Sequence, residues 1–92
     1  MEKRIRRIAE MEGRLNRVAE WLAHPSEASV AEDVHLLETY YHSRLWRSDF
    51  EADEAGKLPR DLPRGVLSED AVYNALEAYA EQEKKKDPLQ TE

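Results

Sequence analysis

Three acidic side chains at alternate positions, Asp49, Glu51 and Asp53, have the spacing that comes closest to a known chemistry. Calcium-binding loops place oxygen ligands in this way, with a glycine at the sixth position and a bidentate glutamate at the twelfth. Counted from Asp49, those positions hold Glu54 and Arg60. Because both diagnostic positions differ, we predict no calcium site and interpret the three residues as part of a solvated, capped helical turn.

A second group that could bind a divalent ion is His35, Glu38 and His42, which share one flank of a predicted helix. Imidazole and carboxylate groups are common ligands of zinc and related metals. However, the two histidines lie about 10 Å apart along the helix axis, which is too far for one ion. We therefore predict no metal and no cofactor, and we expect these side chains to be exposed.

Basic residues are concentrated near the start of the chain. The first 23 residues carry six basic and four acidic side chains, whereas the whole chain carries 14 and 20. The basic ones are Lys3, Arg4, Arg6, Arg7, Arg14 and Arg17. Clustered cations can bind nucleic acid by releasing counterions from its phosphates. Since glutamates interrupt this cluster and no aromatic residue lies among its first arginines, nucleic-acid binding is the alternative hypothesis, and pairing with acidic neighbours is preferred.

The sequence contains no pattern typical of a catalytic centre. Serine, histidine and aspartate are present, but no strand-turn-helix nucleophile elbow and no glycine-rich oxyanion loop accompany them. Cysteine is absent, which removes disulfides, thiolate metal sites and cysteine nucleophiles together. We therefore expect a protein that is not an enzyme.

Length and charge favour a small cytoplasmic protein. A chain of 92 residues with a net charge of −6 forms one domain, too small to enclose a large ligand cavity. The opening MEKRIRRIAE resembles neither a signal peptide nor a membrane span, and the lack of cysteine fits a reducing compartment. We expect a single helical domain over residues 1–86, a disordered tail over 87–92, and no membrane association.

Three long helices are predicted from apolar residues repeated at helical spacing. The first runs over residues 2–23 and carries the stripe Ile8, Met11, Leu15, Val18 and Leu22. The second begins after a cap at Ser26 or Ser29, of which Ser29 is preferred because Glu32 has capping-box spacing from it. This helix carries Val30, Val34, Leu37, Tyr41 and Leu45. The third runs over residues 69–86. Because the first two have similar lengths and a short connection, we predict an antiparallel helical hairpin, with the third helix packed on it.

The connection over residues 46–73 contains strong capping signals. Ser48 and Glu51 have the spacing of a capping box, so we expect a short helix from Ser48 to about residue 55. Gly56 can adopt the left-handed conformation that ends a helix. The Leu-Pro pairs at 58–59 and 62–63 then force extended backbone, and Ser68 caps the third helix.

Four large apolar residues do not fit the predicted core stripes: Trp21, Leu36, Tyr40 and Trp46. One interpretation is that segment 48–67 folds back and buries Trp46 and Tyr40 with other apolar residues of that segment. The other is that Leu36, Trp21 and one of the other two aromatic residues form an exposed patch for a protein partner or a second copy of the chain, because contiguous apolar surface on a small protein marks an interface. We adopt this interpretation, with all four residues as the candidate interaction surface, and the function it predicts is a protein-protein interaction module.

The run YYHSRLWRSDFEADEAGKLPRDLPRGVLSEDAVYNAL, with IAEMEGRLNRV in the first helix, resembles the bacterial domain-of-unknown-function family numbered 4298. The resemblance covers nearly the whole chain. It implies a small, self-contained helical protein, and it implies no activity, substrate or catalytic residue. The predicted fold class is therefore all-α, with a helical hairpin, a short capped helix, a crossover punctuated by prolines, and a third long helix.

Overall fold

The computed structural model describes residues 1–86, and the regular secondary structure in this part of the chain is all helical. Helix α1 spans Glu2–Ala23, α2 spans Ala31–Tyr41, α3 spans Arg44–Glu54 and α4 spans Glu69–Lys86, with a short 3₁₀ helix, η1, at Gly65–Leu67. The predicted all-α class is confirmed. The predicted tail over 87–92 lies outside the described residues.

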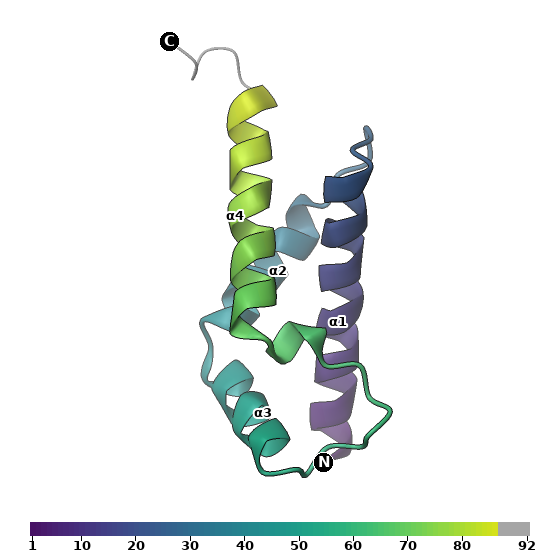
Figure 1. Cartoon of the computed structure of the whole chain (residues 1–92), viewed down its shortest axis with the longest axis vertical. Coiled ribbons are helices and arrows are strands. Elements are labelled where there is room, and N and C mark those ends of the chain that lie inside the picture. Colours follow the sequence, from purple (N-terminus) through teal and green to yellow (C-terminus); the bar gives the residue numbers. More distant parts are fainter. Residues whose placement is uncertain (87–92) are drawn as a thin grey trace.

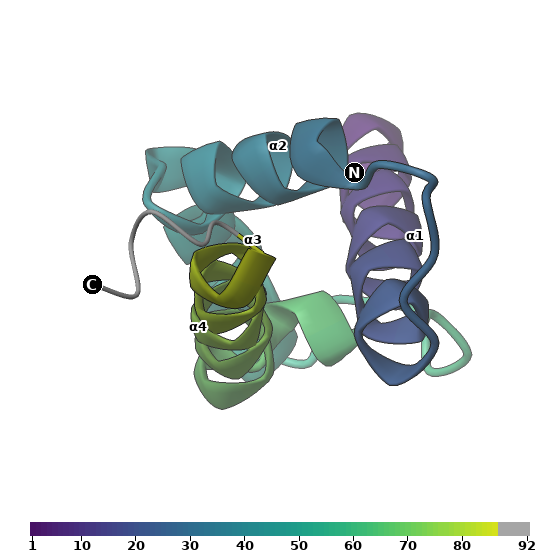
Figure 2. The ribbon, with the colours of Figure 1, turned by 90° about the horizontal axis from the view of Figure 1, so that it is seen from above.

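Helices α1 and α4 run in the same direction, and α2 slants behind α4 (Figure 1). Viewed from above, α4 is seen nearly end-on, α1 is tilted, and α2 lies lengthwise along one side of the two (Figure 2). Helix α1 has the predicted bounds, and its stripe residues Ile8, Leu15 and Val18 are buried. No helix among residues 1–86 is both long and apolar enough to cross a membrane.

The prediction of a second helix as long as the first is wrong, because the helix breaks at His42 and Ser43. The Ser43 hydroxyl donates a hydrogen bond to the Tyr40 carbonyl at 2.6 Å and accepts one from the Trp46 N–H at 3.2 Å. It is therefore the N-cap of α3. Ser48, the predicted cap, lies inside α3, and Leu45, a predicted core residue, is 50% exposed.

The end of α3 and the start of α4 were predicted correctly. Gly56 has a φ of 70°, and the N–H groups of Gly56 and Lys57 bond the carbonyls of Asp53 and Ala52. These two bonds form a Schellman motif, which requires a residue that tolerates positive φ. The Ser68 hydroxyl accepts a hydrogen bond from the Ala71 N–H at 3.3 Å at the start of α4.

Helix η1 is fixed to α1 through Glu12. The Glu12 carboxylate accepts a hydrogen bond from the Val66 N–H at 2.8 Å. It also lies so close to Gly65 that a Cβ there would be 3.1 Å from a carboxylate oxygen. Gly65 therefore allows Glu12 to reach the backbone of η1, and this bond sets where the crossover returns to the core.

Candidate interaction surface

The structure divides the four residues predicted to form one exposed patch. Trp21, Tyr40 and Trp46 are only 6%, 5% and 6% exposed, whereas Leu36 is half-buried. The interpretation of the three aromatic residues as a contiguous exposed patch is therefore wrong. The reason is that other parts of the same chain cover them.

Trp46 is covered by α3 and by η1. Its ring stacks on Phe50 with centroids 5.2 Å apart, and it forms a T-shaped contact with the Tyr41 ring, with centroids 5.3 Å apart. The indole N–H donates a hydrogen bond to the Val66 carbonyl at 3.0 Å. The alternative interpretation, in which segment 48–67 folds back over Trp46, is confirmed.

Tyr40 is buried beside Asp49, a fully buried carboxylate that is 0% exposed. One oxygen of Asp49, Oδ1, accepts hydrogen bonds from Arg4 Nε at 3.0 Å and Arg7 Nη2 at 2.7 Å. The other, Oδ2, accepts from Arg7 Nε at 2.9 Å and from the Tyr40 hydroxyl at 2.6 Å. This network joins α1, α2 and α3. The interpretation of Asp49 as a solvated residue is wrong.

The ionisation of the network follows from these bonds. Burial alone would raise the pKa of the Asp49 carboxyl, but the hydrogen bonds from Arg7 and Tyr40 outweigh it, and the pKa lies below its usual value. Burial raises the pKa of the Tyr40 hydroxyl, and its hydrogen bond to Asp49 raises it further. Asp49 is therefore an ionised structural group, and both of its oxygens are occupied.

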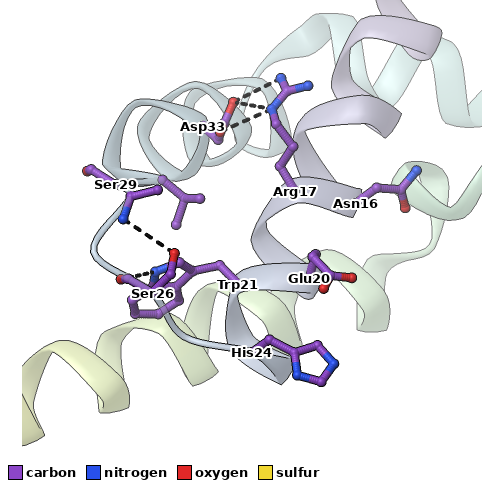
Figure 3. A pocket seen from close by; sticks show the side chains of 10 residues that line it. Asn16, Arg17, Glu20, Trp21, His24, Ser26, Ser29 and Asp33 are labelled. Atoms are coloured by element: carbon purple, nitrogen blue, oxygen red, sulfur yellow. Dashed lines mark hydrogen bonds and ion pairs between the residues drawn. The ribbon is translucent and has the colours of Figure 1, made fainter.

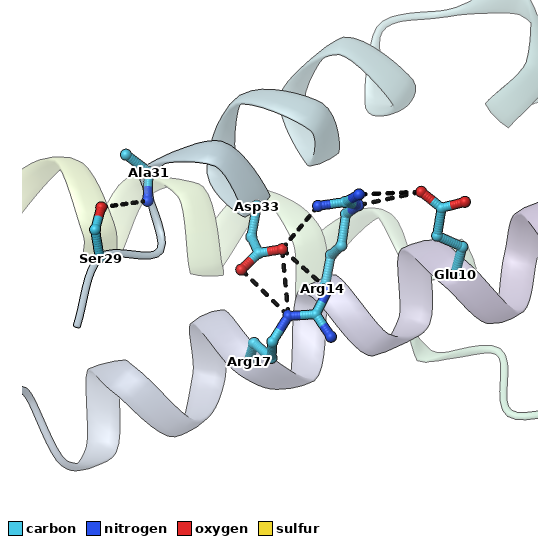
Figure 4. Close-up of polar contacts among 6 residues, drawn as sticks. All are labelled: Glu10, Arg14, Arg17, Ser29, Ala31 and Asp33. Carbon is cyan, nitrogen blue, oxygen red and sulfur yellow. Dashed lines mark hydrogen bonds and ion pairs between the residues drawn. The ribbon is translucent and has the colours of Figure 1, made fainter.

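The remaining arginines of α1 are also paired. Arg14 and Arg17 both bond Asp33 of α2, at 2.9 Å and 3.0 Å, and Arg14 bonds Glu10 as well (Figure 4). Arg6 pairs with Glu2. Among the basic residues of α1 within residues 1–86, Lys3 alone has no ion pair. The basic residues of α1 therefore pair with acidic neighbours, as the preferred hypothesis stated. Few cations of this helix remain to neutralise the phosphates of a nucleic acid.

The predicted metal candidates are not brought together. His35, Glu38 and His42 are exposed on or just after α2, and Asp53 pairs with Arg64 instead of facing Asp49. Within residues 1–86 no group of three or more histidine and acidic side chains is placed to hold a metal ion.

Leu36 lines an apolar groove between α1 and the junction of α2 with α3, which we call the Leu36 groove. Its volume is about 190 Å³. The groove is lined by Met11, Leu36, Thr39, Tyr40, Ser43 and Leu45, and by Arg7. Leu45 is one of the most exposed large apolar residues of the described chain. Two of the four predicted interface residues, Leu36 and Tyr40, therefore meet at one groove.

A second hollow of about 410 Å³ lies beside the Leu36 groove, and Ser43 lines both. We call it the junction hollow. It is lined by His42, Ser43, Arg44, Trp46 and Arg47. Neither Arg44 nor Arg47 forms an ion pair with any residue from 1 to 86. The sequence indicated part of this surface, because Leu36 lies on the outer side of its predicted helix. The exposure of Leu45 could not be predicted, because it depends on the break between α2 and α3.

The search of curated proteins and the search of solved structures each found no match. A family model does match, and it covers the same residues, 1–86, that form the helices described above. The chain therefore belongs to the family described as Domain of unknown function (DUF4298).

Proposed function

We propose that this protein is a non-enzymatic, cytoplasmic binding module that holds an acidic, amphipathic segment of a partner protein. The observation that carries the proposal is the Leu36 groove with the adjoining junction hollow. The Leu36 groove supplies an apolar surface at the junction of α2 and α3, and the junction hollow beside it is lined by Arg44 and Arg47, which form no ion pair within residues 1–86.

The size of the groove favours a side chain over a metabolite. Pockets for small ligands have volumes of about 300–1,000 Å³. The Leu36 groove, at about 190 Å³, is smaller, whereas the junction hollow, at about 410 Å³, lies within that range but has Trp46 as its only large apolar lining residue among residues 1–86. The Leu36 groove is the size of recess into which one apolar anchor of a protein partner inserts, and such anchors supply most of the binding energy at interfaces.

The charge of the surface defines the partner. The chain has 20 acidic and 14 basic residues, yet no carboxylate of the described residues lines either hollow, while Arg44 and Arg47, unpaired within that part of the chain, line the junction hollow. Because complementary potentials steer association and exclude wrong partners, the bound segment should carry apolar side chains flanked by glutamate or aspartate. A helix with leucines along one face and glutamates beside them meets this description.

The test uses a short designed peptide of this kind and a copy in which lysine replaces every glutamate. Fluorescence anisotropy should show binding of the acidic peptide, weakened by added salt, and no binding of the basic copy. Leu45→Glu should weaken binding about tenfold, because roughly half of the burial of a leucine, about 1.4 kcal/mol, is lost at a half-exposed site.

The matched control is Ala9→Glu, which adds the same charge at an exposed position on the far side of α1 from Arg7 and Met11. It should bind as the wild type does. Equal binding of both peptides, or equal weakening by both variants, would refute the proposal. Sedimentation of the wild type shows whether the occupant is a second copy: association that rises with concentration and is lost in Leu45→Glu would identify it.

A further inference from the structure

A larger hollow lies beside the C-terminal end of α1 and has a volume of about 540 Å³ (Figure 3). Its walls include Glu20, Trp21, His24, Ser26, Ala28 and Val30. Unlike the Leu36 groove, it falls within the range of about 300–1,000 Å³ that is usual for small ligands. It lies on a different part of the molecule from the Leu36 groove, and the two share no lining residue.

The charges that face this hollow leave one carboxylate unbalanced. Arg17 and Asp33 line it, but they are bonded to each other, and Asp33 is also bonded to Arg14 (Figure 4). Arg14 is bonded in turn to Glu10. The positive charges of Arg14 and Arg17 are therefore balanced by the negative charges of Asp33 and Glu10. The side chain of Glu20 forms no hydrogen bond or ion pair with residues 1–86. Counting His24 as neutral, the hollow therefore carries the negative charge of Glu20.

The end of α1 adds to this negative potential. The last carbonyl groups of a helix have no partners within it, and the helix dipole makes this end negative. The last turn of α1 contains no basic residue, and Pro25, which follows closely, has no N–H to donate. Both features favour a cation at this end.

Another part of the wall, beside Glu20, is apolar and held in place. The Trp21 indole N–H donates a hydrogen bond to the Ser26 carbonyl at 3.2 Å, and its ring packs against Tyr79 with centroids 5.6 Å apart. Val30 and Ala28 also contribute apolar surface. Trp21 and Val30 are only 6% and 8% exposed, and the surface that they leave open in the hollow is apolar, so this wall accepts the apolar body of an amphipathic cation.

We propose that this hollow is a binding site for a small organic cation, an ammonium or guanidinium group attached to an apolar body. The cation pairs with Glu20 at the negative end of α1, and the apolar body lies against Trp21 and Val30. This inference does not depend on the proposed function, because it uses a different surface.

The test compares three probes of similar size: benzylamine, which is a cation at neutral pH, benzyl alcohol, which is neutral, and benzoate, which is an anion. Saturation-transfer NMR and calorimetry on the full chain should show that benzylamine binds at least about fivefold more tightly than the other two. Glu20→Gln should weaken benzylamine binding by a similar factor. The matched control Glu38→Gln, on an exposed part of α2, should leave it unchanged.

A second variant locates the site independently of charge. Ala28→Phe adds a large side chain at an exposed residue of the hollow and should block benzylamine without loss of the fold, which circular dichroism checks. Benzoate binding as tightly as benzylamine, the absence of benzylamine binding, or unchanged binding in Glu20→Gln would each overturn the proposal.

Discussion

Replacing Asp49 with asparagine should destabilise the protein strongly, because the buried carboxylate accepts four hydrogen bonds from three residues. Asparagine preserves the shape but has one acceptor oxygen in place of two. If that oxygen occupies the Oδ1 position, the new NH₂ group faces the N–H of Arg7 Nε, and two donors meet. Tyr40 can rotate its hydroxyl to accept, but a guanidinium has no acceptor.

The magnitude follows from this loss. The hydrogen bond from Arg7 Nε, worth about 1.5–3 kcal/mol because it joins charged groups, disappears. The other bonds from Arg4 and Arg7 remain but no longer join opposite charges. Breaking a buried ion pair costs about 3–5 kcal/mol, and both arginines remain partly exposed and recover water. We therefore expect a loss of about 3 kcal/mol, out of the roughly 5–14 kcal/mol expected for a domain of this size.

Urea unfolding at neutral pH, followed by circular dichroism, measures this loss. With an m-value of about 1.5 kcal/mol per molar urea, the midpoint should fall by about 2 M. The comparison variant is Asp33→Asn, since Asp33 also meets two arginines but lies nearer the surface. It should cost less than Asp49→Asn, because Asp33 keeps contact with water and its partner Arg17 is more than half exposed. If Asp49→Asn costs no more than Asp33→Asn, the buried network does not hold α3 in place.

The same comparison has a definite pH dependence. The pKa of Asp49 is lower in the folded protein than in the unfolded chain, where it is about 3.9. The folded state therefore binds fewer protons, and the stability from ionised Asp49 is complete above about pH 4 and is lost as the pH falls through the folded pKa. The difference in unfolding free energy between wild type and Asp49→Asn should shrink below about pH 4. A difference that stays constant down to about pH 2 would contradict the assignment.

Three further outcomes are expected. Gly56→Val should lower the unfolding free energy by about 1–2 kcal/mol or more in the same urea assay, because a β-branched residue resists a φ of 70°. Ser43→Ala and Ser68→Ala should each cost about 1 kcal/mol as lost N-caps, and an unchanged midpoint for Ser43→Ala would mean that α2 and α3 are not separated by that cap. Calcium, zinc or a chelator should leave the melting temperature unchanged, whereas a metal at a hundredfold excess over its Kd would add about 2.7 kcal/mol.

The sequence was sufficient where the signals were local. The bounds of α1 and α4, the end of α3 and the cap at Ser68 depend on residues within a few positions of each helix end. Gly56 and Ser68 carry these signals in their own backbone and side-chain chemistry. These helix ends needed no knowledge of the rest of the fold.

The break between α2 and α3 could not be predicted in the same way. The apolar stripe through Leu37, Tyr41 and Leu45 is compatible with one continuous helix, and Ser48 offers a capping box that competes with Ser43. The contacts that favour the break come from distant segments, since Asp49 bonds Arg4 and Arg7 of α1 and Trp46 bonds the Val66 carbonyl. Periodicity within a segment contains no information about such partners.

The Leu36 groove and the junction hollow are consequences of that break. In a continuous helix, Leu45 would lie on the stripe with Leu37 and Tyr41 and would face the core. Because Ser43 ends the first helix and caps the next, Trp46 and Asp49 turn inward and Leu45 turns outward beside the half-buried Leu36. The same turn leaves Arg44 and Arg47 at the start of α3 without an ion pair among residues 1–86. The Asp49 network that fixes α3 therefore also fixes the groove, so loss of the network should disrupt peptide binding even in molecules that remain helical.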